Sequence, residues 1–448
     1  MRNTRWAVMV ALAATVSLVA AGCSNSDTKA TGVSTTVGDD GGGSAGTAAP
    51  GEHVKVDAPG VTDTEIRVGG VASVTNPLGG KFGDAFEGTK AYFDMINASG
   101  GIYGRKLVLA AERDDKTGGN KVEVEALLTQ DQVFAVLPVA TLLFTGADTL
   151  VAQGVPTFGW TINPQWQGSK EEPRSNLFGQ AGSFLCFNCA SPTLPWLAKR
   201  VDAHKIGVLA YTVAESADCA DGVKASFDKY GAAADAEVVF MDKSLAFGTA
   251  DLSVQVSKMK QAGVDLVTTC IDTNGVVTLA KEMKKQELDA VQFLPNAYDH
   301  EFLDEFGDLF EGSFVRTDFV QFEAKEHPKG LKTYLDQIEE AGLEPSENSL
   351  VGWLNADLFV TGLREAGPRF SRQKVIDGIN KLRDYDADGI IGGVDWTKLH
   401  TSVAKPGESC QFLSQIRDSK FDPVLSKPGK PFVCAVDKGG KLTTRYES

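Results

Sequence analysis

The stretch Val133–Trp166, VFAVLPVATLLFTGADTLVAQGVPTFGWTINPQW, constrains the fold of this chain more than any other. It predicts a buried strand over Val133–Leu137, a turn at Pro138, a helix from about Leu142 to Gln153 and a second strand over Val155–Gly159. Two nearly continuous apolar strands joined by a helix are typical of a parallel sheet, because only a strand covered on both faces can be apolar throughout. The stretch therefore predicts a βαβ unit.

Polar residues follow each of these two strands. The segments Pro138–Thr141 and Trp160–Asn163 offer hydroxyls, backbone N–H groups and an indole. In parallel α/β sheets, ligands bind outside the carboxyl ends of the strands. The sequence therefore predicts one wall of a binding site at this edge of the sheet.

Strands and helices also alternate in the rest of the chain, which predicts a doubly wound α/β fold. A first set contains strands at Glu65–Val71 and Lys106–Arg113 and helices at Asp84–Ala98 and Asn120–Thr129. A second set begins near Leu177. It contains strands at Lys205–Tyr211, Ala236–Met241 and Leu266–Cys270, helices at Cys219–Tyr230, Asp251–Ala262 and Thr273–Gln286, and short strands near 292 and 313. A more helical third segment ends in two short strands, Gln411–Arg417 and Pro431–Val436.

Composition excludes several classes of function. The chain has 448 residues, is 42% hydrophobic and carries a formal charge of −15, without a basic stripe, which argues against nucleic acid as a partner. Its five histidines are scattered, and it has neither an HExxH nor a GxSxG motif, so we expect no enzyme and no metal. The loop Leu78–Gly83 lacks the pattern of a phosphate-binding loop, so no nucleotide or other cofactor is expected.

The N-terminus predicts an export signal. Arg2 and Arg5 precede the apolar run Trp6–Ala21, and Ala20-Ala21-Gly22 leads into Cys23, which resembles the lipobox of bacterial lipoproteins. We expect residues 1–22 to be a signal peptide and Cys23 to carry a lipid anchor on the outer face of the bacterial cell membrane. Residues 23–60, with few large apolar side chains, are expected to form a disordered tether. A plain secretory signal is the alternative.

Six further cysteines predict three disulfides in an exported chain, and they are Cys186, Cys189, Cys219, Cys270, Cys410 and Cys434. Cys410 and Cys434 flank the last two predicted strands and could pair across a hairpin. The remaining four would pair among themselves. The alternative, in which Cys186 and Cys189 form a redox or zinc motif, lacks a second CxxC or a histidine at metal spacing.

Three groups of segments resemble the substrate-binding lipoproteins of ABC importers, of the branched-chain amino acid and amide type. They are LTQDQVFAVLPVAT with GVPTFGWTINP, EIRVGGVASVTNPLGGKFGDAFEGTKAYFDMINASGGIYGRKLVL, and EGSFVRTDF with GWLNADLFVTGL. The resemblance implies two doubly wound αβα lobes joined by three crossover hinge strands, the type I periplasmic-binding-protein architecture. Lobe one would span 61–179 with 319–404, and lobe two 180–318 with 405–448. The crossovers would lie near Phe178–Ser183, Thr317–Phe322 and Ser402–Glu408.

The resemblance also implies the ligand-binding residues. A carboxylate-binding position falls at Thr141 and a second cradle at Thr161 and Ile162. Aromatic positions fall at Phe82 and Trp353, and the opposing lobe supplies Cys219, Asp272 and Asn296. Other roles are open for some of them, since Thr141 and Asp272 could cap helices and Trp353 could belong to the core.

The chain departs from the family pattern at two of these positions and at a ninth expected ligand-binding residue, Trp160. Cys219 stands where an aromatic residue is usual, Asn296 where a glutamate pairs with an ammonium group, and Trp160 where a small residue is usual. A branched-chain amino acid is therefore not assigned, and the ligand stays open among amino acids, amides and organic acids.

The expected function is that of a monomeric receptor that binds a small polar solute between its lobes and delivers it to an ABC permease. Two alternatives are a surface sensor of the same fold that signals to a partner protein, and an exported α/β hydrolase.

Overall fold

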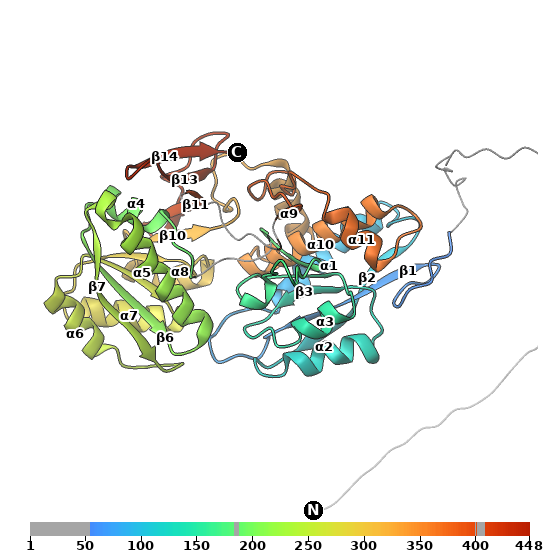
Figure 1. Ribbon diagram of the computed structural model, residues 1–448, viewed down its shortest axis with the longest axis horizontal. Coiled ribbons are helices and arrows are strands. Elements are labelled where there is room, and N and C mark those ends of the chain that lie inside the picture. Colours follow the sequence, from blue (N-terminus) through green and yellow to red (C-terminus); the bar gives the residue numbers. More distant parts are fainter. Residues whose placement is uncertain (1–53, 183–187, 399, 401–407) are drawn as a thin grey trace, which may run out of the picture. The chain divides into compact units, whose positions relative to one another are not determined.

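Apolar runs of the sequence become the strands of two largely separate β-sheets in the computed structural model, which describes residues 54–182, 188–398, 400 and 408–448 (Figure 1). The first sheet has the order β2-β1-β3-β4-β5, and every neighbouring pair is parallel. Its strands are β1 (Glu65–Ala72), β2 (Lys106–Asp114), β3 (Val136–Ala140), β4 (Thr157–Gly159) and β5 (Leu177–Gly179). This is one of the two common orders of doubly wound sheets.

Helices cover both faces of the first sheet. The helices α1 (Asp84–Ala98) and α10 (Glu347–Ala366) pack on each other and on the strands, while α2 (Asn120–Thr129) and α3 (Ala147–Ala152) belong to the opposite face. The helices α9 (Lys329–Glu340) and α11 (Arg372–Ile379) extend the layer formed by α1 and α10. We call this sheet with these six helices lobe one.

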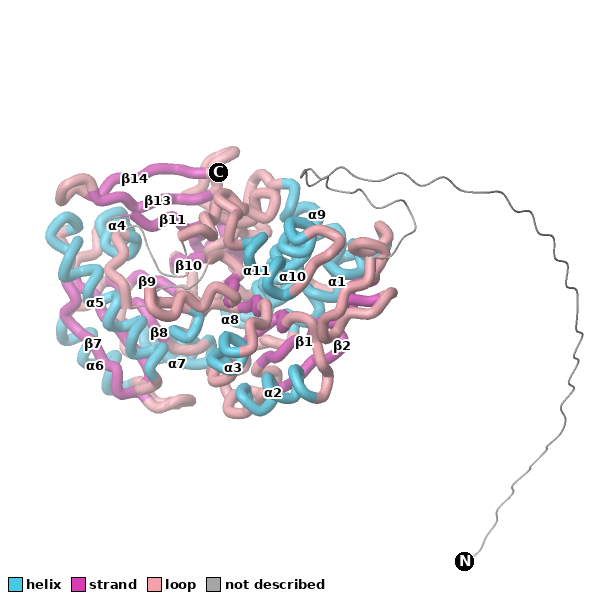
Figure 2. The backbone as a smooth tube through the Cα atoms, turned by 45° about the vertical axis from the view of Figure 1, so that its right-hand side comes forward, coloured by secondary structure: helices cyan, strands magenta, loops and turns pink. Residues whose placement is uncertain are grey.

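The second sheet repeats the same order in its parallel part, β7-β6-β8-β9-β10, and then continues through antiparallel β11, β13 and β14 (Figure 2). Its strands are β6 (Lys205–Tyr211), β7 (Glu237–Leu245), β8 (Leu266–Cys270), β9 (Val291–Leu294), β10 (Phe314–Thr317), β11 (Glu408–Arg417), β12 (Lys420–Asp422), β13 (Phe432–Asp437) and β14 (Leu442–Glu447). The accompanying helices are α4 (Thr193–Arg200), α5 (Ala214–Ala234), α6 (Ser253–Ala262), α7 (Thr273–Lys285) and α8 (His300–Phe306). We call this assembly lobe two.

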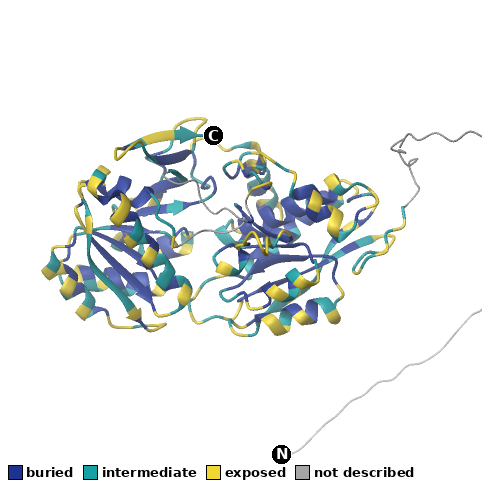
Figure 3. Cartoon of the chain, viewed as in Figure 1, coloured by how far each residue is buried: buried dark blue, intermediate teal, exposed yellow. Residues whose placement is uncertain are grey.

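The alternation of side chains along a strand explains why helices cover both faces of each sheet. In β6, Ile206 and Val208 join an apolar cluster with residues of α4 and α5. Leu209 and Tyr211 point to the other face and join a cluster with residues of α6 and α7. Because successive side chains of a strand point to opposite faces, a strand that is apolar throughout requires helices on both sides. Figure 3 shows the result as buried strands between helices whose outer surfaces are exposed.

Two predictions within the opening stretch were wrong. The turn expected at Pro138 is absent, because β3 continues through this residue to Ala140. Proline lacks a backbone N–H, and β3 tolerates it because its pairing with both neighbours is irregular between Val136 and Val139. The helix expected from Leu142 begins only at Ala147, so Leu142 and Leu143 lie in a loop.

The chain crosses between the lobes in two regions that the structure describes at least in part. It leaves lobe one after β5 and enters lobe two before α4, with residues 183–187 outside the described part. The second crossing follows β10. It is short, since Phe319 already pairs with Ile391 and the Val320 N–H donates to the Ile390 carbonyl at 2.8 Å in lobe one. The third predicted crossover, Ser402–Glu408, lies outside the described residues except for Glu408.

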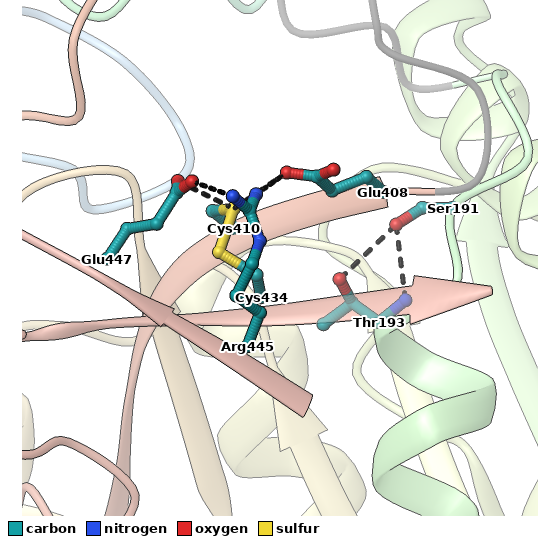
Figure 4. Close-up of a disulfide and its surroundings, with 7 residues drawn as sticks. All are labelled: Ser191, Thr193, Glu408, Cys410, Cys434, Arg445 and Glu447. Atoms are coloured by element: carbon teal, nitrogen blue, oxygen red, sulfur yellow. Dashed lines mark hydrogen bonds and ion pairs between the residues drawn. A yellow bond between two sulfur atoms is a disulfide. The ribbon is translucent and has the colours of Figure 1, made fainter. Parts of the chain in front are cut away.

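Two disulfides are described, both within lobe two. Cys219 of α5 is bonded to Cys270 at the end of β8, and Cys410 of β11 is bonded to Cys434 of β13 (Figure 4). Cys186 lies outside the described residues, so the third bridge stays a prediction. Glu408 and Glu447 flank the second disulfide, and both carboxylates form ion pairs with Arg445. These contacts make the group a cross-linked ion-pair cluster rather than a metal centre.

The signal peptide, Cys23 and most of the predicted tether lie outside the described residues. The last part of that tether is bound to lobe one, since the Val54 carbonyl accepts from Arg105 Nη2 at 2.8 Å and the Gly60 carbonyl from the Arg67 N–H at 2.7 Å. In the described part of the chain, no helix is both long enough and apolar enough to cross a membrane.

Candidate ligand-binding site

A cavity of about 890 Å³ lies where the carboxyl ends of both sheets meet. Residues that follow β1, β3 and β4 line it from lobe one, and residues that follow β6, β8 and β9 line it from lobe two. In each sheet the strand order reverses at its first strand, because the second strand is added on one side of it and the third on the other, and such switch points leave a crevice at the carboxyl ends of the parallel strands. The site predicted from one βαβ unit is therefore one wall of a two-walled cavity.

Two aromatic pairs form much of the apolar lining. Phe82 and Trp160 of lobe one have ring centroids 5.4 Å apart. Tyr211 and Phe247 of lobe two have centroids 4.8 Å apart, and Phe247 is 47% exposed. An exposed aromatic ring at a cavity mouth is costly in water, so the lining favours a ligand with apolar surface.

The loop after β1 brings Phe82 to the cavity. The Asn76 side chain donates to the Gly80 carbonyl at 2.8 Å and accepts from the Leu78 N–H at 3.0 Å, which folds the glycine-rich segment into a tight turn. The loop also contacts lobe two, because Asn274 Nδ2 donates to the Leu78 carbonyl at 3.3 Å and Lys81 forms an ion pair with Glu301.

Six of the nine predicted ligand-binding residues line the cavity, and they are Phe82, Trp160, Ile162, Cys219, Asp272 and Asn296. Asp272 has a structural role as well, because its carboxylate caps α7 by accepting from the backbone N–H groups of Asn274 and Gly275. It also accepts from the Tyr211 hydroxyl. Burial and this carboxylate raise the pKa of Tyr211.

The other three predicted residues do not line the cavity in this structure. Trp353 is 3% exposed and packs between Tyr92 and Tyr334, with ring centroids 4.8 and 5.5 Å away. Thr161 is buried, and its N–H donates to Gln180 Oε1 at 3.2 Å. Core packing, the alternative role considered for Trp353, is what its side chain does here, whereas the internal hydrogen bond of Thr161 was not anticipated.

Thr141 is the most informative of the three because its hydroxyl donates to the carboxylate of Asp115, a residue that is 1% exposed. Asp115 also accepts from the Ser73 hydroxyl at 2.8 Å and from the Thr117 N–H at 2.8 Å. Asn120 Nδ2 donates to it at 3.3 Å. Four donors therefore converge on the two carboxylate oxygens of this buried side chain. The position of Asp115 just after a predicted strand gave no sign of this arrangement in the sequence.

Glu347 lines the cavity, although the sequence did not predict it there. It is the first residue of α10, directly after Ser346, whose side chain and that of Ser349 form a reciprocal capping box. Burial raises the pKa of Glu347 to about 8, Asp318 and Asp299 add to the rise, and Arg316 opposes it. The Ser-x-x-Ser spacing before an apolar run could have located the start of α10. No feature of the neighbouring sequence indicated that this helix start lines a cavity.

Carboxyl groups outnumber cationic groups on the cavity wall. The carboxyl groups belong to Asp84, Glu87, Glu215, Asp272, Asp299, Glu301, Asp304, Glu344 and Glu347. Among the described lining residues the lysine and arginine side chains are those of Lys81 and Arg316. Both are already ion-paired, Lys81 with Glu301 and Arg316 with Asp318 at 3.3 Å.

The sequence of residues 65–420 matches the model of the periplasmic binding protein family, which covers well over half of the chain. The chain belongs to the periplasmic binding protein family. A search of curated proteins finds no match to this sequence.

Solved structures show the same fold in other periplasmic binding proteins. The fatty acid ABC transporter substrate-binding protein from Thermomonospora curvata is 18% identical, with a TM-score of 0.66, and the match covers 88% of this chain and 94% of that one. The branched-chain amino acid transporter substrate-binding protein LivJ from Streptococcus pneumoniae, in complex with isoleucine, is 16% identical, with a TM-score of 0.65. The match covers 85% of this chain and 100% of that one. A solute-binding protein from R. palustris in complex with 4-hydroxybenzoate is 15% identical, with a TM-score of 0.62 and coverage of 85% and 96%. These likenesses confirm the predicted two-lobed type I fold.

Proposed function

We propose that this periplasmic binding protein is an extracytoplasmic receptor that captures a small solute between its lobes and delivers it to an ABC permease. The observation that carries the proposal is the cavity of about 890 Å³, lined from both lobes at the carboxyl ends of both sheets. A ligand that contacts both walls only when the lobes are closed shifts the population toward the closed form. A permease that recognises the closed form then binds the receptor that carries its solute.

An N-terminal lipid on Cys23 would hold this receptor at the outer face of the membrane. The support is the sequence pattern before Cys23, and the short hydrophilic segment that separates it from lobe one. The binding role does not depend on the anchor.

A thermal-shift screen tests the receptor function. The purified protein is heated with a library of amino acids, amides, organic acids, organic amines and neutral aromatic compounds. A true ligand at 100 times its dissociation constant adds about 2.7 kcal/mol to the free energy of unfolding, which moves the melting temperature by several degrees. We expect one chemical class to do so, with one molecule bound per chain by calorimetry and without turnover. If every class leaves the melting temperature unchanged, the proposed function is wrong.

A further inference from the structure

Two of the three positions expected to bind a ligand carboxylate, Thr141 and Thr161, are engaged within the protein. The Thr141 hydroxyl donates to Asp115, the Leu142 N–H donates to Ser73 Oγ at 3.0 Å, and the Thr161 N–H donates to Gln180. An anion placed at Thr141 would also lie beside the buried carboxylate of Asp115, which nothing cationic neutralises among its hydrogen-bond partners. Like charges at short range in a low-dielectric site repel strongly. This edge of lobe one disfavours a carboxylate ligand.

A small side pocket next to the main cavity offers a different head-group site. It has a volume of about 30 Å³ and is lined by Trp160, Ile162, Arg316 and Glu347, among others. That volume suits a group about the size of a water molecule or an ammonium. The face of an indole attracts a cation, and a carboxylate supplies a counter-charge.

The Glu347 carboxyl is available to such a group. In the described part of the chain it makes no hydrogen bond or ion pair, although it lines both the cavity and the side pocket. Arg316 lines the same side pocket, but its guanidinium is engaged by Asp318 at 3.3 Å. The other wall residues add further carboxyl groups, so the surroundings favour positive charge in the ligand.

We propose that the solute is an organic amine with an apolar body, whose ammonium group binds between Glu347 and Trp160. The inference rests on the proposed receptor function and specifies its ligand class. The apolar body lies against the pairs Phe82–Trp160 and Tyr211–Phe247.

The protonation of Glu347 gives this binding mode a signature. The charged groups around Glu347 are Asp318 and Asp299, which raise its pKa together with burial, and Arg316, which lowers it. With a pKa of about 8, the carboxyl is largely protonated at neutral pH in the empty site. An ammonium beside it favours the ionised form, so binding releases a proton. Affinity for the amine therefore rises with pH until about pH 8, while the amine stays protonated.

Three probes with the same apolar body separate the possibilities: phenethylamine, 3-phenylpropionate and 2-phenylethanol. Calorimetry at pH 7 in buffers of different ionisation enthalpy measures both affinity and proton release. We expect the amine to bind about tenfold or more tightly than the other two, with proton release. Glu347→Gln should weaken the amine about tenfold or more and remove the proton release. Glu365→Gln, an exposed glutamate at the other end of α10, is the matched control and should match the unmodified protein.

Each other outcome has a defined meaning. Tighter binding of the acid than of the amine, or an unchanged amine affinity in Glu347→Gln, overturns this inference and leaves the receptor function standing. If Glu347→Gln does not fold, Trp160→Leu replaces it and should weaken the amine more than the alcohol. If none of the probes binds, the solute found in the library screen tests the inference instead. An ammonium head group in that solute supports the inference, and an acidic or neutral solute overturns it. A library without any ligand contradicts the receptor function itself.

Discussion

At the scale of single residues, the decisive contact is the one between Thr141 and Asp115. A hydroxyl at the end of a parallel strand can serve a ligand or serve the protein, and here it serves a buried carboxylate. A buried charge requires hydrogen-bond donors, because its desolvation is otherwise uncompensated. Thr141 and Ser73 therefore stabilise the fold at a position where the family resemblance implied ligand binding.

Thr141→Val tests this role. The variant keeps the shape of the side chain but removes one donor from Asp115, so the free energy of unfolding should fall by about 1–3 kcal/mol. The dissociation constant of the ligand identified by screening should change less than twofold. Chemical denaturation and calorimetry measure the two quantities, and Thr129→Val, at an exposed threonine of α2, is the control. A large loss of affinity without a loss of stability would return Thr141 to the binding site.

At the scale of elements, the contact between α1 and α10 places Glu347. A Cβ atom on Gly88 would lie 1.7 Å from the Ser349 carbonyl oxygen, and one on Gly352 would lie 1.9 Å from the Ala85 carbonyl oxygen. The two helices therefore approach each other closely at these glycines. Ser346 Oγ donates to Asp84 Oδ2 at 2.9 Å and Thr89 Oγ1 to the Gly352 carbonyl at 3.0 Å, which fixes the start of α10 at the cavity.

Gly88→Ala should disturb the site through this helix pair. The added methyl group forces α10 away from α1, at a cost of about 1–3 kcal/mol, and it displaces the first turn that carries Glu347. We expect lower stability together with weaker ligand binding. Gly392→Ala, where a Cβ would meet nothing within 4 Å, is the matched control. Unchanged affinity in a folded Gly88→Ala variant would show that the helix contact does not position the cavity wall.

At the scale of the whole molecule, a polar cluster ties lobe two to the second crossing. His300 Nε2 lies 2.5 Å from Glu323 Oε1, and the Tyr298 hydroxyl donates to Glu323 Oε2 at 2.8 Å. The hydrogen bond to Glu323 raises the pKa of His300, with smaller contributions from Asp299 and Asp304. Because Glu323 follows the crossing, while Tyr298 lies just before α8 and His300 is its first residue, the cluster links the two lobes.

This cluster predicts a pH dependence of stability. A histidine whose pKa is higher in the folded state contributes stability that is complete below its unfolded pKa of about 6.5 and is lost as pH rises through the folded pKa. The unmodified protein should therefore lose more stability above about pH 6.5 than His300→Gln does. Glu323→Gln should lessen the loss of stability with rising pH to a similar extent, because it removes the carboxylate that raises the pKa of His300. Melting temperatures from pH 6 to 9 measure the slopes, and parallel curves for all three proteins would contradict the prediction.

The sequence by itself determined the elements whose signals are local. The helix predicted over Asp84–Ala98 and the strands predicted over Lys205–Tyr211 and Leu266–Cys270 have these bounds in the structure, because periodicity, caps and apolar runs act within one element. The two-lobed α/β fold and six cavity residues could be anticipated from the order of such elements and from the family resemblance.

Only the tertiary structure decided which side chains line the cavity. Thr141 is paired with Asp115, 26 residues earlier in the chain, and Cys219 with Cys270, 51 residues later. Glu347 reaches the cavity because α10 packs on α1. Asp84 and Ser346, which join these two helices by a hydrogen bond, are 262 positions apart in the sequence. Hydrogen bonds, disulfides and helix contacts over such separations depend on the folded arrangement, and no local pattern in the chain encodes them.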